Sequence, residues 1–284
     1  STSAGGEAGD ITLTSSGGTV SNTWNYYARG GAGGTGGGAA AHGGAGGNIV
    51  VSGTSITFGN AAIDNSGGAA AGTANGGAGG IITATASSGS ITTANTISST
   101  GGAGGSGNGA PGNGGAGGTI TFTAATSVSV GNNYLRTLGG AGAGDGNGGA
   151  GGNISITASA GAITTLNMIL ADGGNSGSTA TNQSGGNGGT ITLNASTSMT
   201  IGMGGTLSTT GGTSRGTGTS SGGNVTLTAP SGITLTANVS MTASTTGGDL
   251  TINDGNSTVT SGGANDGQAV GYVISGRNFT KLGA

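Results

Sequence analysis

The sequence predicts an all-β protein, a right-handed parallel β-helix in which about eight coils of three short strands stack along one axis. A strand-like segment recurs eight times, its apolar residues alternate with a period of two, and two shorter strand-like segments follow it in a fixed order. Glycine makes up 74 of the 284 residues. This periodicity therefore distinguishes the chain from a low-complexity sequence.

The longest repeated segment begins directly after a glycine. Its copies are DITLTS from Asp10, NIVVSG from Asn48, IITATA from Ile81, TITFTA from Thr119, NISITA from Asn153, TITLNA from Thr190, NVTLTA from Asn224 and DLTIND from Asp249. Successive starts are 38, 33, 38, 34, 37, 34 and 25 residues apart. A constant strand with variable spacing is typical of stacked units whose insertions lie in loops.

Each copy alternates inward and outward positions, as a strand does. We expect the inward positions to hold Ile11, Ile49, Ile82, Ile120, Ile154, Ile191, Val225 and Leu250 and, two residues later, Leu13, Val51, Ala84, Phe122, Ile156, Leu193, Leu227 and Ile252. The outward positions next to them hold Thr12, Val50, Thr83, Thr121, Ser155, Thr192, Thr226 and Thr251. One face of the solenoid is therefore predicted to carry columns of threonine.

Two shorter segments complete each coil. Segments such as SITF at 55–58 and SVSV at 127–130 predict a second strand, and an apolar residue four positions before the next Gly-Gly marks a third. Coils stacked about 4.8 Å apart pair each backbone group with the neighbouring coils. A β-sandwich also has many short alternating strands. Its strands would not recur as an ordered trio, so the solenoid is favoured.

Glycine-rich insertions separate the coils. They span 30–47, 67–80, 101–118, 139–152, 173–189 and 211–223, so lengths of 18, 14, 18, 14, 17 and 13 residues alternate between long and short. One interpretation is an ordered side layer of extended glycine helices of the polyproline II type, in which glycine lets backbones approach closely. The other is a set of loops without fixed structure, because ordering many glycines is entropically costly.

Composition excludes several classes of function. The chain has no cysteine, so neither disulfides nor Cys-based metal sites are available. Five basic and eight acidic residues argue against nucleic-acid binding, which depends on clustered Lys and Arg. No apolar run approaches the roughly 20 residues of a membrane span. The first residues do not resemble a signal peptide, so we expect any export signal to be removed or to lie outside this chain.

The repeats resemble a known family. The segments GGNVTLTAPSGITLTANVSMTASTTGGDLTI, GGNISITASAGAITT and GGAGGTITFTAATSVSVGN are similar to the β-helical passenger repeats of filamentous-haemagglutinin-like adhesins and related autotransporter proteins. The final YVISGRNFTKLGA resembles the opening of an autotransporter-associated strand repeat. The resemblance covers nearly the whole chain, and it implies export across a bacterial outer membrane and a role at the cell surface or in an extracellular fibre.

No catalytic constellation emerges from the sequence. Asp64 and Asp172 are expected in the third strand, one and three positions after its apolar residue, but three coils apart, too far to share a glycosidic bond. His42 lies in an insertion without a base or nucleophile beside it. Asp254 and Asp266, each in an Asn-Asp-Gly turn, are weak candidates for calcium ligands. We therefore expect no enzyme activity and no cofactor.

Two surface features are candidates for binding. The outward threonines form a flat Thr-x-Thr array, a geometry similar to the ice-contact faces of β-solenoid antifreeze proteins; the candidate contacts are Thr12, Thr83, Thr121, Thr192 and Thr226. The aromatic segment NTWNYYARG offers Trp24 and Tyr27 either as a glycan-stacking platform or as a cap over the open end of the core.

The sequence predicts one β-solenoid over residues 1–284. Residues 1–29 form an N-terminal coil with an aromatic cap, 30–248 form the repeats with glycine-rich insertions, and 249–284 form a C-terminal coil whose ending suggests an incomplete turn. The expected function is that of a secreted structural or adhesive protein of a bacterial surface, which assembles with itself or binds a host glycan or protein. Ice binding and the binding or degradation of polysaccharides are the alternatives.

Overall fold

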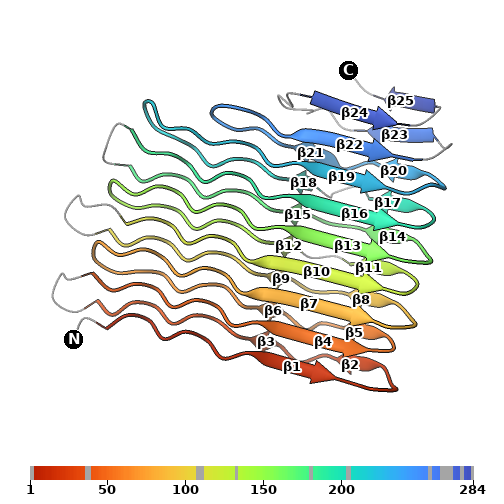
Figure 1. Ribbon diagram of the computed structural model, residues 1–284, viewed down its shortest axis with the longest axis horizontal. Coiled ribbons are helices and arrows are strands. Elements are labelled where there is room, and N and C mark those ends of the chain that lie inside the picture. The colour runs from red at the N-terminus through yellow and green to blue at the C-terminus, as the bar shows by residue number, and fades with distance from the viewer. Residues whose placement is uncertain are drawn as a thin grey trace.

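The protein is an all-β solenoid in the computed structural model (Figure 1). The structure describes residues 3–35, 40–106, 112–131, 134–178, 182–202, 206–254, 258–262, 271–275 and 278–282. These residues contain no helix, and their strands pair in parallel into three sheets. Strand follows strand around the solenoid, so that each turn from β1 to β21 contributes one strand to each sheet, whereas β22 to β25 alternate between the first and second sheets.

The first sheet contains the longest strands, in the order in which they occur along the chain. It consists of β1 (Ile11–Thr14), β4 (Ile49–Gly53), β7 (Ile81–Ala86), β10 (Thr119–Ala124), β13 (Ile154–Ala158), β16 (Ile191–Ala195), β19 (Val225–Thr228), β22 (Asp249–Asn253) and β24 (Gly271–Ser275). The eight repeated segments of the sequence form the first eight strands of this sheet, from β1 to β22, and β24 is a ninth strand that was not predicted.

The second and third sheets consist of shorter strands. The second is β2 (Val20–Asn22), β5 (Ile56–Phe58), β8 (Ile91–Thr93), β11 (Val128–Val130), β14 (Ile163–Thr165), β17 (Met199–Ile201), β20 (Ile233–Leu235), β23 (Thr258–Gly262) and β25 (Asn278–Leu282). The third is β3 (Tyr26–Tyr27), β6 (Ile63–Asp64), β9 (Ile97–Ser98), β12 (Leu135–Arg136), β15 (Ile169–Leu170), β18 (Thr206–Ser208) and β21 (Asn238–Ser240).

The register of the first sheet confirms the predicted columns. In β10 and β13, Ile120 pairs with Ile154 and Phe122 pairs with Ile156, while the residues between them face outward. Every described strand pairs in parallel with the corresponding strand of the adjacent turn. This pattern excludes the β-sandwich, whose strands would pair antiparallel.

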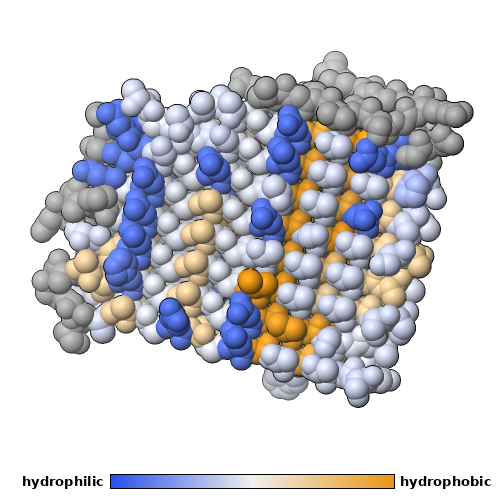
Figure 2. Space-filling view, viewed as in Figure 1, coloured by the Kyte–Doolittle hydropathy of each residue, from blue (hydrophilic) through white to orange (hydrophobic). Residues whose placement is uncertain are grey.

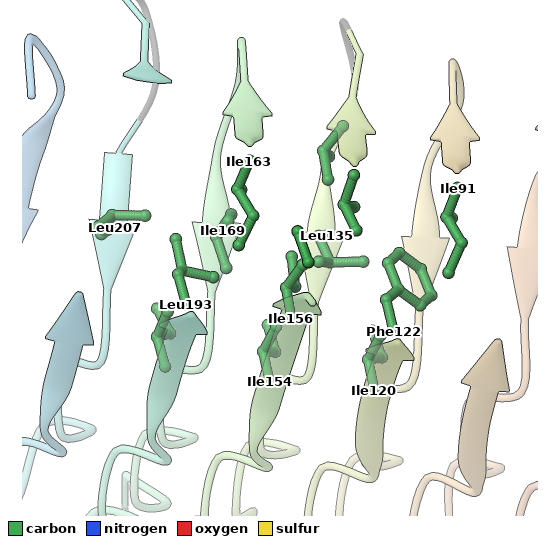
Figure 3. Packing of buried hydrophobic residues seen from close by; sticks show 14 of the residues in the cluster. Ile91, Ile120, Phe122, Leu135, Ile154, Ile156, Ile163, Ile169, Leu193 and Leu207 are labelled. Atoms are coloured by element: carbon green, nitrogen blue, oxygen red, sulfur yellow. The ribbon is translucent and has the colours of Figure 1, made fainter. Parts of the chain in front are cut away.

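The core is a continuous stack of aliphatic side chains inside the three sheets. Figure 3 shows Ile120 and Phe122 of β10 and Leu135 of β12 pointing into the interior between the sheets. These three side chains are almost completely buried. Burial of each such side chain contributes about 1.5–3 kcal/mol relative to exposure, so the stack can stabilise a chain that has no disulfide.

The glycine-rich segments extend from one side of the sheets (Figure 1). We call the part that leaves the third sheet the outgoing segment and the part that re-enters the first sheet the returning segment; for one insertion these are residues 99–105 and 112–118. The amide of Gly115 donates to Gly102 O at 2.8 Å, and Gly102 in turn donates to Gly77 O of the preceding returning segment at 2.8 Å. Gly114 donates to Asn147 O of the following one at 2.9 Å.

Space at these contacts admits only glycine. A Cβ atom on Gly115 would lie 2.0 Å from the carbonyl oxygen of Gly77, and one on Gly149 would lie 2.0 Å from that of Gly115. Side chains instead occupy every third position, as at the half-buried Asn113 and the exposed Ala116. The backbones therefore approach one another across successive turns without intervening side chains.

The short insertions end in a tight turn. Gly72, Gly144 and Gly216 have φ angles of 63°, 56° and 58°, the left-handed region that glycine adopts without strain. They lie 72 residues apart, since 144 − 72 = 72 and 216 − 144 = 72, so this turn recurs in every second insertion. The tips of the long insertions, at 36–39, 107–111 and 179–181, lie outside the described residues.

Candidate functional site

The predicted threonine columns align on the outer face of the first sheet. Thr83 pairs with Thr121, and Thr192 pairs with Thr226, so that their side chains share one column. Thr12 belongs to the same column, where it pairs with Val50. Figure 2 shows the result as pale rows of residues running up this face. The five candidate threonines are therefore placed on one surface, in a column that Val50 interrupts.

A ladder of asparagines runs along the returning segments, and it was not predicted from the sequence. Asn75 Oδ1 accepts the amide of Asn113 at 3.0 Å, and Asn113 Oδ1 accepts the amide of Asn147 at 2.8 Å. These side chains thus accept hydrogen bonds from the backbone amides of Asn113 and Asn147, whereas the glycine amides donate to backbone carbonyls. The recurring motif NGGAGG at 75–80, 113–118 and 147–152 is the signal that could have revealed the ladder.

His42 belongs to this ladder. It occupies the position of Asn in the motif HGGAGG, and its Nδ1 accepts the amide of Asn75 at 3.2 Å. A ring nitrogen that accepts a hydrogen bond carries no proton, so the described contact requires the tautomer protonated at Nε2. The contact assigns His42 a structural position in the ladder.

The two carboxylates near the third sheet are far apart. Asp64 lies in β6 and Asp172 lies two residues beyond β15, and β9 and β12 lie between these strands. Three steps of about 4.8 Å separate the two turns by about 14 Å along the axis. Asp172 accepts hydrogen bonds from Ser208 Oγ and from the amide of Thr210. Burial raises the pKa of the Asp172 carboxyl above its usual range, and both hydrogen bonds oppose that shift.

The calcium candidates are only partly described. Asp254 is completely buried, and neither of its carboxylate oxygens has a hydrogen-bond partner in the described part of the chain. Asp266 lies outside the described residues. Within the residues that are described, no group of three or more acidic, His or Cys side chains is gathered as a metal would require. The calcium site therefore stays a prediction.

The aromatic segment presents Trp24 and Tyr27 to solvent. Trp24 is 80% exposed and Tyr27 is 51% exposed. Asn22 fixes the turn at Trp24, because its Oδ1 accepts the Trp24 amide at 3.0 Å and its Nδ2 donates to Trp24 O at 2.7 Å. The indole is thus held on an ordered turn although little of its surface is buried.

Tyr26 packs against the end of the core in this segment. Its ring meets Phe58 edge-on, with centroids 6.5 Å apart. Burial raises the pKa of the Tyr26 hydroxyl, and a hydrogen bond with Asn22 opposes the shift. The exposure of Trp24 fits a surface platform better than a cover over the core.

Tyr27 is part of a polar cluster on the outer face of the third sheet. Asn25 Nδ2 donates to Tyr27 Oη at 2.9 Å, and the guanidinium of Arg29 lies 4.4 Å from the centre of the Tyr27 ring. Arg29 also forms an ion pair with Asp64, with 2.7 Å between Nη2 and Oδ2. Asp64 is thus engaged in a surface cluster rather than in a pair of carboxylates.

Comparison with known proteins identifies no relative: no family model, no curated protein and no solved structure matches the chain. Among the described residues, no helix is long and apolar enough to cross a membrane.

Proposed function

We propose that this protein is an extracellular structural and adhesive protein of a bacterial surface, whose solenoid serves as a rigid stalk that presents binding surface. The observation that carries the proposal is the uninterrupted parallel pairing of the first sheet from β1 to β24. Because successive turns are joined by backbone hydrogen bonds and a common core, bending or local opening would break many bonds at once. The resemblance to adhesin repeats supports export and surface location.

We further propose that the glycine-rich segments form an ordered side layer of polyproline II-type glycine helices along an eight-coil, right-handed β-helix. The hydrogen bonds of Gly114 and Gly115 to two different neighbouring segments support it, because a helix with three residues per turn directs successive amides to different partners. The close contacts at Gly115 and Gly149 support it as well, since they leave room only for packed backbones. Such a layer would widen and stiffen the stalk.

Self-association into a fibre is part of this proposal. A stack with one repeating register can be extended by another copy through the same backbone hydrogen bonds. Low charge favours this, because five basic and eight acidic residues produce little repulsion between copies.

Electron microscopy of the purified protein tests the stalk. We expect straight rods, and filaments that lengthen as the protein concentration rises. Flexible or globular particles at every concentration would contradict the proposed stalk, and a monomer of fixed length at high concentration would contradict self-association.

Ice binding is a second candidate, because Thr121 and Thr123 are in register with Thr83 and Thr85 of β7. Thermal hysteresis and the shaping of growing ice crystals test it, with Thr121→Lys as the variant that disrupts the column. An unmodified ice crystal in the presence of the native protein would exclude this function.

We propose no catalytic activity. The separation of Asp64 from Asp172 supports this, because a pair of carboxylates must lie within about 10 Å to cleave a glycosidic bond. Incubation with a panel of polysaccharides tests it, and release of reducing ends would contradict it.

A further inference from the structure

Exposed aromatic side chains gather on one part of the solenoid. The chain has one tryptophan and four tyrosines in 284 residues. The aromatic residues with large exposure among those described are Trp24 at 80%, Tyr27 at 51% and Tyr134 at 40%. All three lie in strands of the third sheet or within two residues before them, namely at β3 and β12.

Three of the chain's charged residues, Arg29, Asp64 and Arg136, lie in or beside the same strands of the third sheet. The pairing of β3, β6, β9 and β12 aligns Tyr27 with Asp64, then with the buried Ser98 and then with Arg136 in one column. Tyr134 precedes β12, and its carbonyl accepts the amide of Ile97 in the adjacent strand. We call this set the aromatic strip: Trp24, Tyr27, Arg29, Asp64, Tyr134 and Arg136.

The strip has a defined length. Tyr27 and Tyr134 belong to turns three steps apart, which places them about 14 Å from each other along the axis. Trp24 and Tyr27 are three residues apart in the chain, so their Cα atoms lie within about 10 Å. The surface can therefore contact several successive rings of an extended ligand.

Hydrogen bonds and ion pairing fix the polar groups between the aromatics. Arg29 is held by the Tyr27 ring and by the Asp64 carboxylate, and Arg136 Nε donates to Ser98 Oγ at 3.1 Å. Within the strip Asp64 is paired with Arg29, and the described contact of Arg136 is with a neutral serine. Arg136 therefore contributes a positive charge that no carboxylate of the described chain neutralises.

Flat exposed rings beside fixed hydrogen-bonding groups suit the faces and hydroxyls of sugar rings, since an aromatic side chain provides apolar contact area at low cost in conformational entropy. A guanidinium without a carboxylate partner suits a ligand that supplies one, because Arg binds carboxylates in a bidentate manner. We propose that the aromatic strip binds an extended acidic oligosaccharide, with its rings against Trp24 and Tyr134 and a carboxylate at Arg136. This inference rests on the adhesive function proposed above and names its ligand class.

Trp24 provides a direct test, because it is the single tryptophan of the chain and its fluorescence reports on the strip alone. The probes are tetragalacturonate and sialyllactose as acidic saccharides and cellotetraose as a neutral one. We expect a saturable change in Trp24 emission with at least one acidic saccharide and at least tenfold weaker binding of cellotetraose. Tyr134→Ala and Arg136→Gln should each weaken the binding of the acidic saccharide by about tenfold or more.

Two matched substitutions serve as controls. Ile81→Ala removes an exposed apolar side chain from the first sheet, and Arg215→Gln removes a cation from the glycine-rich side. Both should bind like the native protein.

No change with any probe, equal affinity for cellotetraose, or native binding by both strip variants would overturn the proposal. If such a failure occurs while electron micrographs show rods, the proposed stalk is supported and only the proposed ligand class is wrong.

Discussion

Gly115 lies between two backbones, and its hydrogen atom faces the carbonyl oxygen of Gly77, where a Cβ would be only 2.0 Å away. We expect Gly115→Ala to lower the free energy of unfolding by about 1–3 kcal/mol or more, because overpacking must displace backbone rather than a flexible side chain. Urea denaturation measures this loss. Ala116→Ser, at the exposed neighbouring position, should change stability by less than about 0.5 kcal/mol. Equal stability of both variants would mean that the two segments are not in contact.

Asp172 carries a pKa raised by burial, which makes its effect on stability depend on pH. A carboxyl with a higher pKa in the folded state contributes stability that is fully present below its unfolded pKa and is lost as pH rises through the folded pKa. We therefore expect Asp172→Asn to increase the free energy of unfolding at pH 7, and the difference to disappear below about pH 4.

Denaturation of Asp172→Asn at pH 7 and pH 3.5 measures this effect. Glu7→Gln is the control, because Glu7 is exposed and its replacement should leave stability unchanged at both values. A variant that is less stable than the native protein at pH 7 would show that the hydrogen bonds from Ser208 and Thr210 outweigh the cost of burial.

At the scale of elements, buried polar side chains connect the third sheet to the returning segments. Thr137, directly after β12, donates from Oγ1 to Gly152 O at 2.9 Å, and Thr209, directly after β18, donates in the same way to Gly223 O at 2.6 Å. Both threonines are buried. Each bond joins the beginning of one insertion to its end, and therefore fixes where the chain re-enters the first sheet.

Replacement of Thr137 by valine tests this connection. We expect Thr137→Val to lower the free energy of unfolding by about 1 kcal/mol or more, since a buried hydrogen bond is lost while the volume is kept. Thr121→Val, on the outer face of β10, removes a hydroxyl of similar shape and should have a smaller effect. Thermal or urea unfolding of the two variants distinguishes them. The connection would be refuted if Thr137→Val were as stable as the native protein.

The elements differ in how far the sequence predicts them. Alternation in segments such as TITFTA reveals the inward positions of Ile120 and Phe122, because burial of one face of a strand imposes a period of two. The third strand has only two residues in β6 and β12, too few to show a period. Its position is predicted instead by the apolar residue four positions before the next Gly-Gly, which aligns Ile63 with Leu135, and the pairing of the third sheet confirms that alignment.

The asparagine ladder was missed. Asn113 and Asn147 are 34 residues apart, and their bond joins a side chain to a backbone amide of the next turn. Composition and local patterning do not indicate such a pairing. The repeated position of Asn before Gly-Gly indicates it only once the turns are known to stack.

At the scale of the whole molecule, glycine-rich segments extend along one side of the β-solenoid, and we propose that they form an ordered side layer. Each turn from β1 to β21 contributes three strands to the sheets, and the glycine-rich insertions supply the outgoing and returning segments. The sheets derive their stability from a dry core, whereas the glycine-rich segments have backbone hydrogen bonds and close contacts in its place. Their order is the central claim, because a stiff stalk depends on it.

Residue-resolved amide hydrogen exchange tests that claim most directly. The amides of Gly114, Gly115, Gly117 and Gly118 donate to neighbouring segments, whereas no bond from the exposed Ala116 amide is found among the described residues. We predict slow exchange at these four glycines and fast exchange at Ala116, with the same fast exchange at the equivalent positions Ala78 and Ala150. Uniformly fast exchange across 112–118, with protection confined to the strands, would contradict the account.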